Sequence, residues 1–377
     1  MTPRERFMTA IRNQVPDGVP VCPDISNMIP CRLTGKPFWD VYLHEDPPLW
    51  QAYLDAVDYF KFDGWVNYGG IEWKTKTRIE TTRKVVSRTD ERLTVRCVFR
   101  TPAGELTEEV VYYVGDPPTC TEHKVKDVRR DFPALKYFFE EPVGYDATLF
   151  EEIRRRTGEK GITCLGVGTP GFHHYVGFME GGLEALVYAY YDHPDLFEEL
   201  TELVHRQEVR MCEMLCEVKP DCICTGGSGS ITMQSPDIWR KLSLPTLKEI
   251  CRIAREADVL TMVHSCGRER ELVKACAEET ELNCVNPLEI SPMGDCDLAE
   301  LKRTFGDRIS LMGNLHTTDV MLRGTPADVE RAARKAIDDA AEGGGFILST
   351  GDQCGRDTPD GNLFKLVEVA RTYGRYD

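Results

Sequence analysis

The chain has 377 residues, 41% of them hydrophobic, which is enough to bury a large core without forcing a division into two domains. Its 62 acidic residues outnumber its 46 basic ones, and no run rich in Lys or Arg offsets the net charge of −16. This balance argues against nucleic acid as a partner. The sequence opens on a charged amphipathic segment and nowhere contains about 18 apolar residues in succession, which predicts a cytoplasmic protein with no membrane partner.

Short apolar runs alternate with longer amphipathic segments from about residue 160 onward. Six of these runs have the composition of buried strands, and two earlier runs are similar to them. The eight runs are 19–23, 64–67, 161–167, 221–225, 259–264, 284–286, 309–313 and 345–350. Because repeated strand and helix units form parallel sheets, we expect a closed (β/α)8 TIM barrel, with residues 1–377 in a single domain.

Two of the intervening helices carry clear start signals. One is predicted over 236–257, with Ser235 as the N-cap before Pro236. The other is predicted over 326–342, with Thr325 in the same position before Pro326.

Residues 75–115 have a different pattern, because polar and apolar residues alternate within runs that are separated by turn residues. The runs are 77–83, 93–100 and 106–114. This pattern predicts an antiparallel β meander inserted into the barrel.

Metal-ligating residues follow two of the predicted strands. His264 and Cys266 end the strand 259–264 and precede Gly267, while Asp352 and Cys354 follow the last strand. Active sites of such barrels form at the carboxyl ends of the strands, so these side chains are expected to meet. An imidazole and two thiolates, from His264, Cys266 and Cys354, would hold zinc and leave a fourth position open for substrate, as in catalytic zinc sites.

The chain has fifteen cysteines, and those outside this site are scattered along the sequence. This distribution predicts that most of them are reduced core residues. Cys222 and Cys224 alternate with apolar residues in a strand, which favours packing over metal binding. A chain this rich in thiols suits an anaerobic or strongly reducing cytosol.

Several motifs together resemble the uroporphyrinogen decarboxylase superfamily, and in particular its cobalamin-dependent branch, which includes the methylcobamide:coenzyme M methyltransferases. The motifs lie at 1–12, 168–171, 235–236, 263–267, 311–315, 324–326 and 343–362. The decarboxylases carry an Arg-Gln-Ala-Gly-Arg-Tyr motif after their first strand. The corresponding residues 24–34 read Asp-Ile-Ser-Asn-Met-Ile-Pro-Cys-Arg-Leu-Thr and do not contain that motif. That difference favours the methyltransferase branch.

The resemblance implies a (β/α)8 barrel, zinc held by His264, Cys266 and Cys354, and cobalamin delivered by a separate corrinoid protein. This sequence departs from the family pattern because Asp352 stands where the distal cysteine normally follows the last strand, and Cys354 comes two residues later. We favour Cys354 as the third ligand because thiolate is the softer donor. Asp352 would then complete the metal shell, accept a hydrogen bond from the histidine, or cap the following helix.

Further polar residues at strand ends are candidates for catalysis or substrate binding. Glu289 and Asp352 are the catalytic candidates, with Glu289 placed to reach the metal or a substrate hydroxyl. The substrate-binding candidates are Asp24, Asn27, Tyr68, His173, His174 and His316.

The expected activity is zinc-dependent transfer of a methyl group between a small substrate and the cobalamin of a corrinoid protein. The substrate would be a thiol, a tetrahydrofolate, a methylamine-derived methyl group or a methoxylated compound undergoing O-demethylation. Two alternatives stay open, a tetrapyrrole decarboxylase and a corrinoid-binding barrel without turnover.

Overall fold

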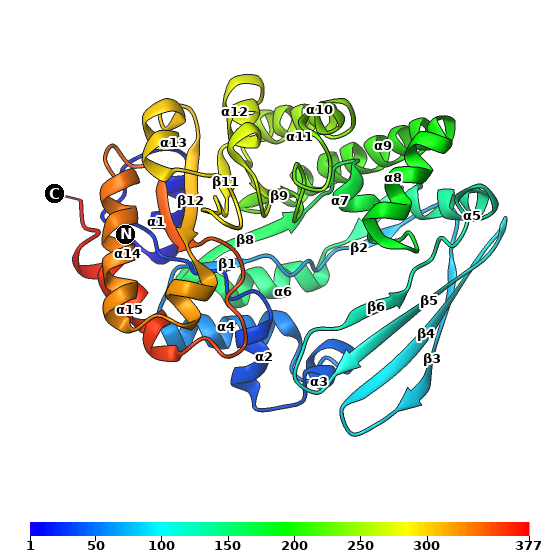
Figure 1. Ribbon diagram of the computed structural model, residues 1–377, viewed down its shortest axis with the longest axis horizontal. Helices are drawn as coiled ribbons and strands as arrows, with labels where there is room; N and C mark the ends of the chain where they lie inside the picture. Colours follow the sequence, from blue (N-terminus) through cyan, green and yellow to red (C-terminus); the bar gives the residue numbers. More distant parts are fainter. Residues whose placement is uncertain (377) are drawn as a thin grey trace.

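The centre of the protein, in a computed structural model that describes residues 1–376, is a ring of parallel strands (Figure 1). Seven strands form one sheet in the order β1-β8-β9-β10-β11-β12-β13. Their bounds are β1 Gly64–Val66, β8 Gly161–Gly166, β9 Cys222–Gly226, β10 Leu260–His264, β11 Cys284–Asn286, β12 Ser310–Leu315 and β13 Phe346–Thr350. Nearly every residue of these strands is buried, as expected for a parallel sheet covered on both faces.

The segment 19–23 joins the two edges of this sheet. Val21 pairs in parallel with Leu348 of β13, and the Asp63 N–H beside β1 donates to the Val21 carbonyl at 2.8 Å. The α/β barrel fold is therefore confirmed. The strand predicted over 19–23 is present only as a single β-bridge, between Val21 and Leu348.

Helices follow the strands and surround the ring (Figure 1). Their bounds are α1 Pro3–Ile11, α2 Met28–Thr34, α3 Phe38–Leu43, α4 Leu49–Phe60, α5 Val128–Leu135, α6 Thr148–Thr157, α7 Phe172–Tyr175, α8 Gly182–Asp192, α9 Pro194–Val218, α10 Pro236–Leu242, α11 Leu244–Glu256, α12 Arg270–Glu279, α13 Leu298–Phe305, α14 Pro326–Ala340 and α15 Asp360–Thr372, with the short turns η1 Lys136–Phe139, η2 Gly158–Lys160 and η3 Thr317–Leu322. Among residues 1–376, no helix has the length and apolar character needed to cross a membrane.

The predicted helix starts are confirmed, but one predicted helix is divided. Ser235 accepts a hydrogen bond from the Ile238 N–H, and Thr325 forms a reciprocal capping box with Asp328. The run 236–257 forms two helices, α10 and α11, that meet at Ser243. The break follows from Pro245, which lacks an N–H and clashes with the carbonyl four residues earlier, so a continuous helix is disfavoured there.

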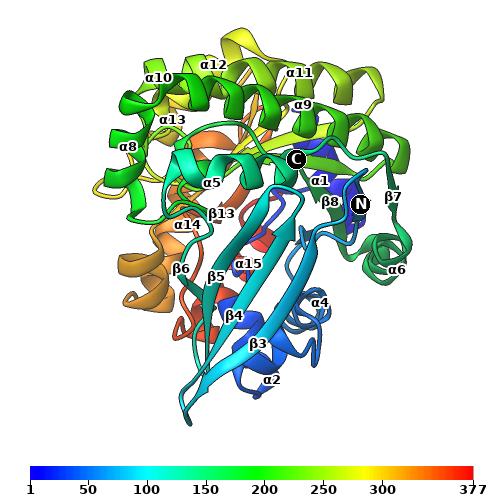
Figure 2. The same cartoon turned by 90° about the vertical axis from the view of Figure 1, so that its right-hand side faces the viewer.

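The inserted meander is a four-stranded antiparallel sheet beside the barrel (Figures 1 and 2). Its strands are β3 Glu80–Arg88, β4 Arg92–Thr101, β5 Gly104–Tyr113 and β6 Thr119–Glu122, and a separate pair joins β2 Glu72–Lys74 to β7 Gly144–Asp146. The sequence pattern correctly predicted the insertion but missed its fourth strand, which is only four residues long. Along β4, Leu93, Val95 and Cys97 are buried while Arg92 and Arg96 are exposed, so one face packs on the molecule.

This sheet is fastened to loops that leave the carboxyl ends of barrel strands. Arg356, in the loop after β13, donates to the Gly115 carbonyl and forms an ion pair with Asp116 at 3.3 Å. At the other end of the sheet, the His123 N–H donates to Glu180, in the segment after β8, at 2.7 Å. The insertion therefore stands on the side of the barrel where the candidate site lies.

Candidate metal centre

Three potential metal ligands converge at the mouth of the barrel. His264 is the last residue of β10, Cys266 follows it by two positions, and Asp352 lies in the loop after β13. One ligand atom from each lies within 4.8 Å of the others, and His264 Nε2 is 3.3 Å from Cys266 Sγ. Tetrahedral zinc with nitrogen and sulfur ligands requires about 3.6 Å between those two atoms. The donor set therefore fits zinc.

The orientation of the His264 ring is fixed by Asn286, the last residue of the neighbouring strand β11. The two residues stand opposite each other in the parallel register, and Asn286 Oδ1 lies 3.2 Å from His264 Nδ1. An amide oxygen there accepts from Nδ1–H, which leaves the Nε2 lone pair toward Cys266 and Asp352. Asn286 was not among the residues predicted from the sequence, although its position at a strand end was a usable signal.

This arrangement predicts a measurable effect of Asn286 on metal affinity. Replacing Asn286 with Ala is expected to weaken zinc binding by about 10- to 100-fold, because the ring loses the partner that orients it. Competition against a chromophoric chelator measures this affinity. Asn283→Ala is the matched control, since Asn283 bonds the Thr261 N–H at the other end of the strand (2.9 Å). An equal loss in both variants would contradict the role given to Asn286.

The Cys266 thiol is half-buried and donates to Ser228 Oγ at 3.3 Å. Burial raises its pKa, and the nearby carboxylate of Asp352 raises it further. A thiol and a carboxylate held this close are stabilised together by a divalent cation, which favours the thiolate.

Asp352 lies in a strained stretch of backbone. Its φ of 148° is uncommon for a residue with a Cβ, and the Thr350 hydroxyl donates to its carbonyl at 2.8 Å. Such strain is concentrated at functional sites, where surrounding contacts hold the chain in place.

Cys354 is not part of the cluster, which corrects the choice of Cys354 as the third ligand. Its side chain has no exposed surface and lies in the main core, and its N–H donates to the Asp24 carbonyl at 2.7 Å. The loop turns at Asp352, and the backbone hydrogen bond from Cys354 to Asp24 holds it two residues later. The Asp352 carboxylate therefore lies close to His264, while the Cys354 thiol lies in the core.

Two cavities meet at His264 and Asn67, which line both of them. The smaller, about 320 Å³, is lined by the predicted residues Asp24, Asn27 and Tyr68 together with His264 and Asp352. The larger, about 580 Å³, is lined by the predicted residues His173 and His174. Five of the six predicted substrate contacts therefore lie around the candidate metal centre.

Among the catalytic and substrate-binding candidates, Glu289 and His316 do not line these cavities. Glu289 is buried, and burial raises its pKa; it accepts from the Gly267 N–H at 2.5 Å and so holds the turn after Cys266. His316 accepts from the N–H groups of Thr318 and Asp319 at the start of η3, and it lines a separate cavity of about 230 Å³.

Glu208, on helix α9, is a second residue that was not predicted from the sequence. It lines the larger cavity, is only 6% exposed, and accepts from the Gly168 N–H at 2.6 Å. Burial raises its pKa to about 7. A Cβ at Gly168 would lie 2.9 Å from Glu208 Oε1, so glycine there leaves room for the carboxyl group. The spacing of residues in the sequence could have indicated its burial. Glu208 lies four residues after Val204 and four before Cys212, on the buried face of the helix.

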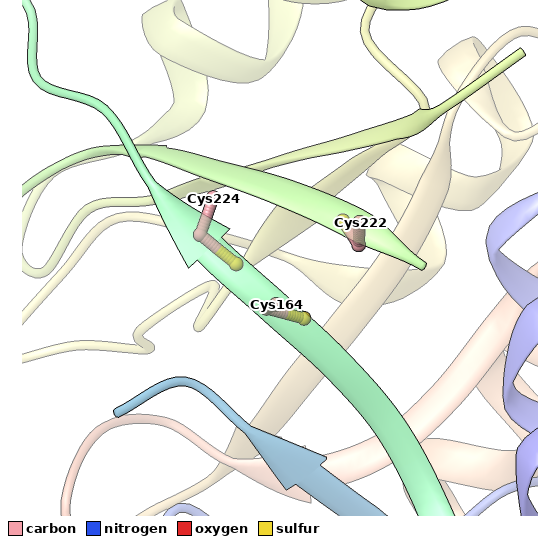
Figure 3. Close-up of side chains that lie close together, drawn as sticks. All are labelled: Cys164, Cys222 and Cys224. Carbon is pink, nitrogen blue, oxygen red and sulfur yellow. The ribbon is translucent and has the colours of Figure 1, made fainter. Parts of the chain in front are cut away.

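A second group of sulfur atoms lies inside the ring (Figure 3). Cys164 of β8 stands opposite Cys222 of β9 in the parallel register, and Cys224 follows on the same strand; their sulfur atoms are within 4.8 Å of one another. All three are reduced and buried, in keeping with the prediction that they are core residues.

The fold and the site together define an α/β barrel protein with a His-Cys-Asp candidate metal centre at its mouth. Residues 109–373 match the family model described as uroporphyrinogen decarboxylase (URO-D). Because this match covers more than half of the chain, the protein belongs to that family, as its motifs indicated.

Solved and curated proteins agree with this assignment. The fold is similar to that of a methyltransferase from Methanosarcina mazei, with a TM-score of 0.66 over 99% of both chains at 16% sequence identity. The methylcobamide:CoM methyltransferase MtbA of Methanosarcina mazei is 31% identical over 139 residues, and MtaA of Methanosarcina barkeri is 27% identical over 192. These matches cover 36% and 48% of this chain, and 37% and 50% of the two relatives.

Proposed function

We propose that this protein is a zinc-dependent methyltransferase that moves a methyl group between a small substrate and the cobalamin of a partner corrinoid protein. The observation that carries the proposal is the convergence of His264, Cys266 and Asp352 beside two cavities, in a chain related to methylcobamide methyltransferases. Three protein ligands leave one coordination position open, which is typical of catalytic zinc.

Each ligand has a defined task in this mechanism. Asn286 holds His264 so that Nε2 faces the metal position, while Cys266 and Asp352 supply two negative charges that neutralise a divalent cation. Zinc bound there would supply Lewis acidity to the heteroatom that gains or loses the methyl group. His264 lines both cavities, so a substrate in either of them would lie next to the residues that would hold the metal.

The sizes of the cavities support a small substrate. Their volumes of about 320 and 580 Å³ are in the range of about 300–1,000 Å³ found for small-molecule sites. The cobalamin would approach the mouth from outside, carried by its own protein.

A decarboxylase acting on a polycarboxylated tetrapyrrole is the less favoured alternative. In residues 1–376, neither Lys nor Arg lines either cavity, so several substrate carboxylates would lie without cationic partners.

The assay that tests the proposal uses zinc-loaded protein, cob(I)alamin and a panel of methylated substrates. We expect the absorption spectrum of methylcobalamin to develop with at least one donor, to be abolished by a chelator, and to return when zinc is restored. A zinc-free protein that decarboxylates uroporphyrinogen and forms no methylcobalamin with any donor would overturn the proposal.

A further inference from the structure

The charge of the two cavities is unusual for a site that binds an anion. Among the residues described, 1–376, none of the chain's Lys or Arg side chains lines either cavity, whereas the carboxyl groups of Asp24, Asp352 and Glu208 do. Zinc at the metal centre would be neutralised by Cys266 and Asp352. Asp24 and Glu208 would then be left as acidic groups without a counter-ion.

The burial of these two carboxyl groups lowers the stability of the folded protein. Asp24 is 8% exposed and Glu208 is 6% exposed. The side-chain oxygens of Asp24 accept from the Ser26 hydroxyl, and those of Glu208 accept from the Gly168 N–H. Burying a carboxylate without a cation costs on the order of several kcal/mol, because the charged group loses its hydration. A neutral amide in the same place would avoid that cost.

The neighbouring histidines do not supply the missing positive charge. Burial lowers the pKa of His173 to about 3 and also lowers the pKa of His174, so both rings are neutral near pH 7. Within residues 1–376, the Nδ1 atoms of both rings and the hydroxyl of Thr225, which is 4% exposed, are buried without a hydrogen-bond partner. All three residues line the larger cavity, which marks it as a place for a polar ligand.

Aromatic side chains add to the preference for a cation. Trp65, Tyr53 and Tyr68 line the smaller cavity, and the ring centroids of the two tyrosines are 5.0 Å apart. The faces of aromatic rings carry partial negative charge and attract organic cations, with Trp the strongest of the three types.

We infer that the substrate bound beside this metal centre is a small organic cation, whose ammonium group lies among these acidic and aromatic side chains and not on the metal, rather than a sulfonate or carboxylate. The inference rests on the proposed function for the identity of the site as a substrate site. It depends on geometry and charge: two buried carboxyl groups without counter-ions, aromatic walls, and cavities that no described Lys or Arg reaches. A sulfonate placed there would be repelled by the acidic groups and would meet no cationic side chain.

Equilibrium binding tests the inference without any turnover. Calorimetric titration of the zinc-loaded protein at pH 8, above the raised pKa of Glu208, would compare choline, its uncharged isostere 3,3-dimethylbutan-1-ol, and the anionic thiol 2-mercaptoethanesulfonate. We expect choline to bind at least about tenfold more tightly than the isostere, and the sulfonate to bind most weakly. Binding of the isostere as tight as that of choline, or preference for the sulfonate, would overturn the inference.

Variants assign the effect to the buried carboxyl groups. Glu208→Gln and Asp24→Asn keep the size of each side chain and remove its charge, and we expect at least one of them to lower the affinity for choline about tenfold. Glu213→Gln, on the exposed face of the same helix α9, is the matched control and is expected to bind as the parent protein does. Unchanged affinity in both cavity variants would contradict the inference.

The two proposals fail in different ways. If methylcobalamin forms only from uncharged or anionic donors, the inferred substrate charge is wrong and the methyltransferase stands. If choline binds as expected but no donor produces methylcobalamin, the proposed reaction fails and the cation site stands.

Discussion

Replacing His264 with Ala or Cys266 with Ser is expected to reduce bound zinc from about one equivalent to near zero and to lower methyl transfer by at least about 100-fold. Each change removes one of three ligands, and the two that remain hold a divalent ion weakly. The metal-free variants should melt within a few degrees of the metal-free parent, because the ligands lie at strand ends and the core does not depend on them. Elemental analysis and thermal melting measure the two quantities.

A second pair of variants separates the two residues that follow β13. Asp352→Asn is expected to lose zinc, while Cys354→Ala is expected to retain it and to unfold more easily, by about 1–2 kcal/mol, because it leaves a small void in the core. The opposite pattern, with zinc retained in the Asp352 variant and lost in the Cys354 variant, would restore Cys354 as the third ligand.

Glu208→Gln is expected to stabilise the protein at high pH. The carboxyl group has a pKa of about 7 in the folded protein against an ordinary value of 4.5, and burial is the cause of the difference. Below pH 4.5 both states hold the proton and the substitution has little effect on the free energy of unfolding. Between pH 4.5 and 7 the unfolded chain loses the proton first, so the stability of the parent falls as the pH rises, by about 3 kcal/mol in total.

Denaturant unfolding at pH 5 and pH 8 measures this effect. The stability gained by Glu208→Gln should be small at pH 5 and should approach about 3 kcal/mol at pH 8. Glu213→Gln is the matched control, because Glu213 lies on the surface of the same helix and pairs with Arg210 at 2.6 Å. A gain that is the same at both pH values would show that Glu208 is not destabilised by ionisation.

Much of the fold followed from local patterns. Buried parallel strands are short apolar runs closed by polar residues, so β8, β9, β10 and β13 begin and end within one or two residues of the predicted bounds. Their carboxyl ends also located His264 and Cys266. The segment 19–23 has the composition of a strand and was predicted as one. It completes the ring with a single β-bridge, and composition does not distinguish such a segment from a regularly paired strand.

The features that the sequence did not predict depend on the path of the chain in three dimensions. The choice between Asp352 and Cys354 is made by a loop whose backbone is anchored at Asp24, more than 300 residues away in the sequence. Glu208 was missed because the contact that places it in the cavity is made with Gly168, 40 positions earlier in the sequence, and no local pattern around Glu208 shows that contact. In both cases the deciding contact is made with a distant segment.

The seam of the barrel also has a consequence for how the site forms. The Asp24 N–H donates to the Thr350 hydroxyl across 326 positions of the sequence, so this contact closes a loop nearly as long as the chain. During synthesis His264 and Cys266 emerge well before Asp352, and a nascent barrel therefore holds two donors and an open edge. At the proposed metal centre, full affinity would arise only when the last strand docks against the first segment, so binding of the metal would follow closure of the barrel.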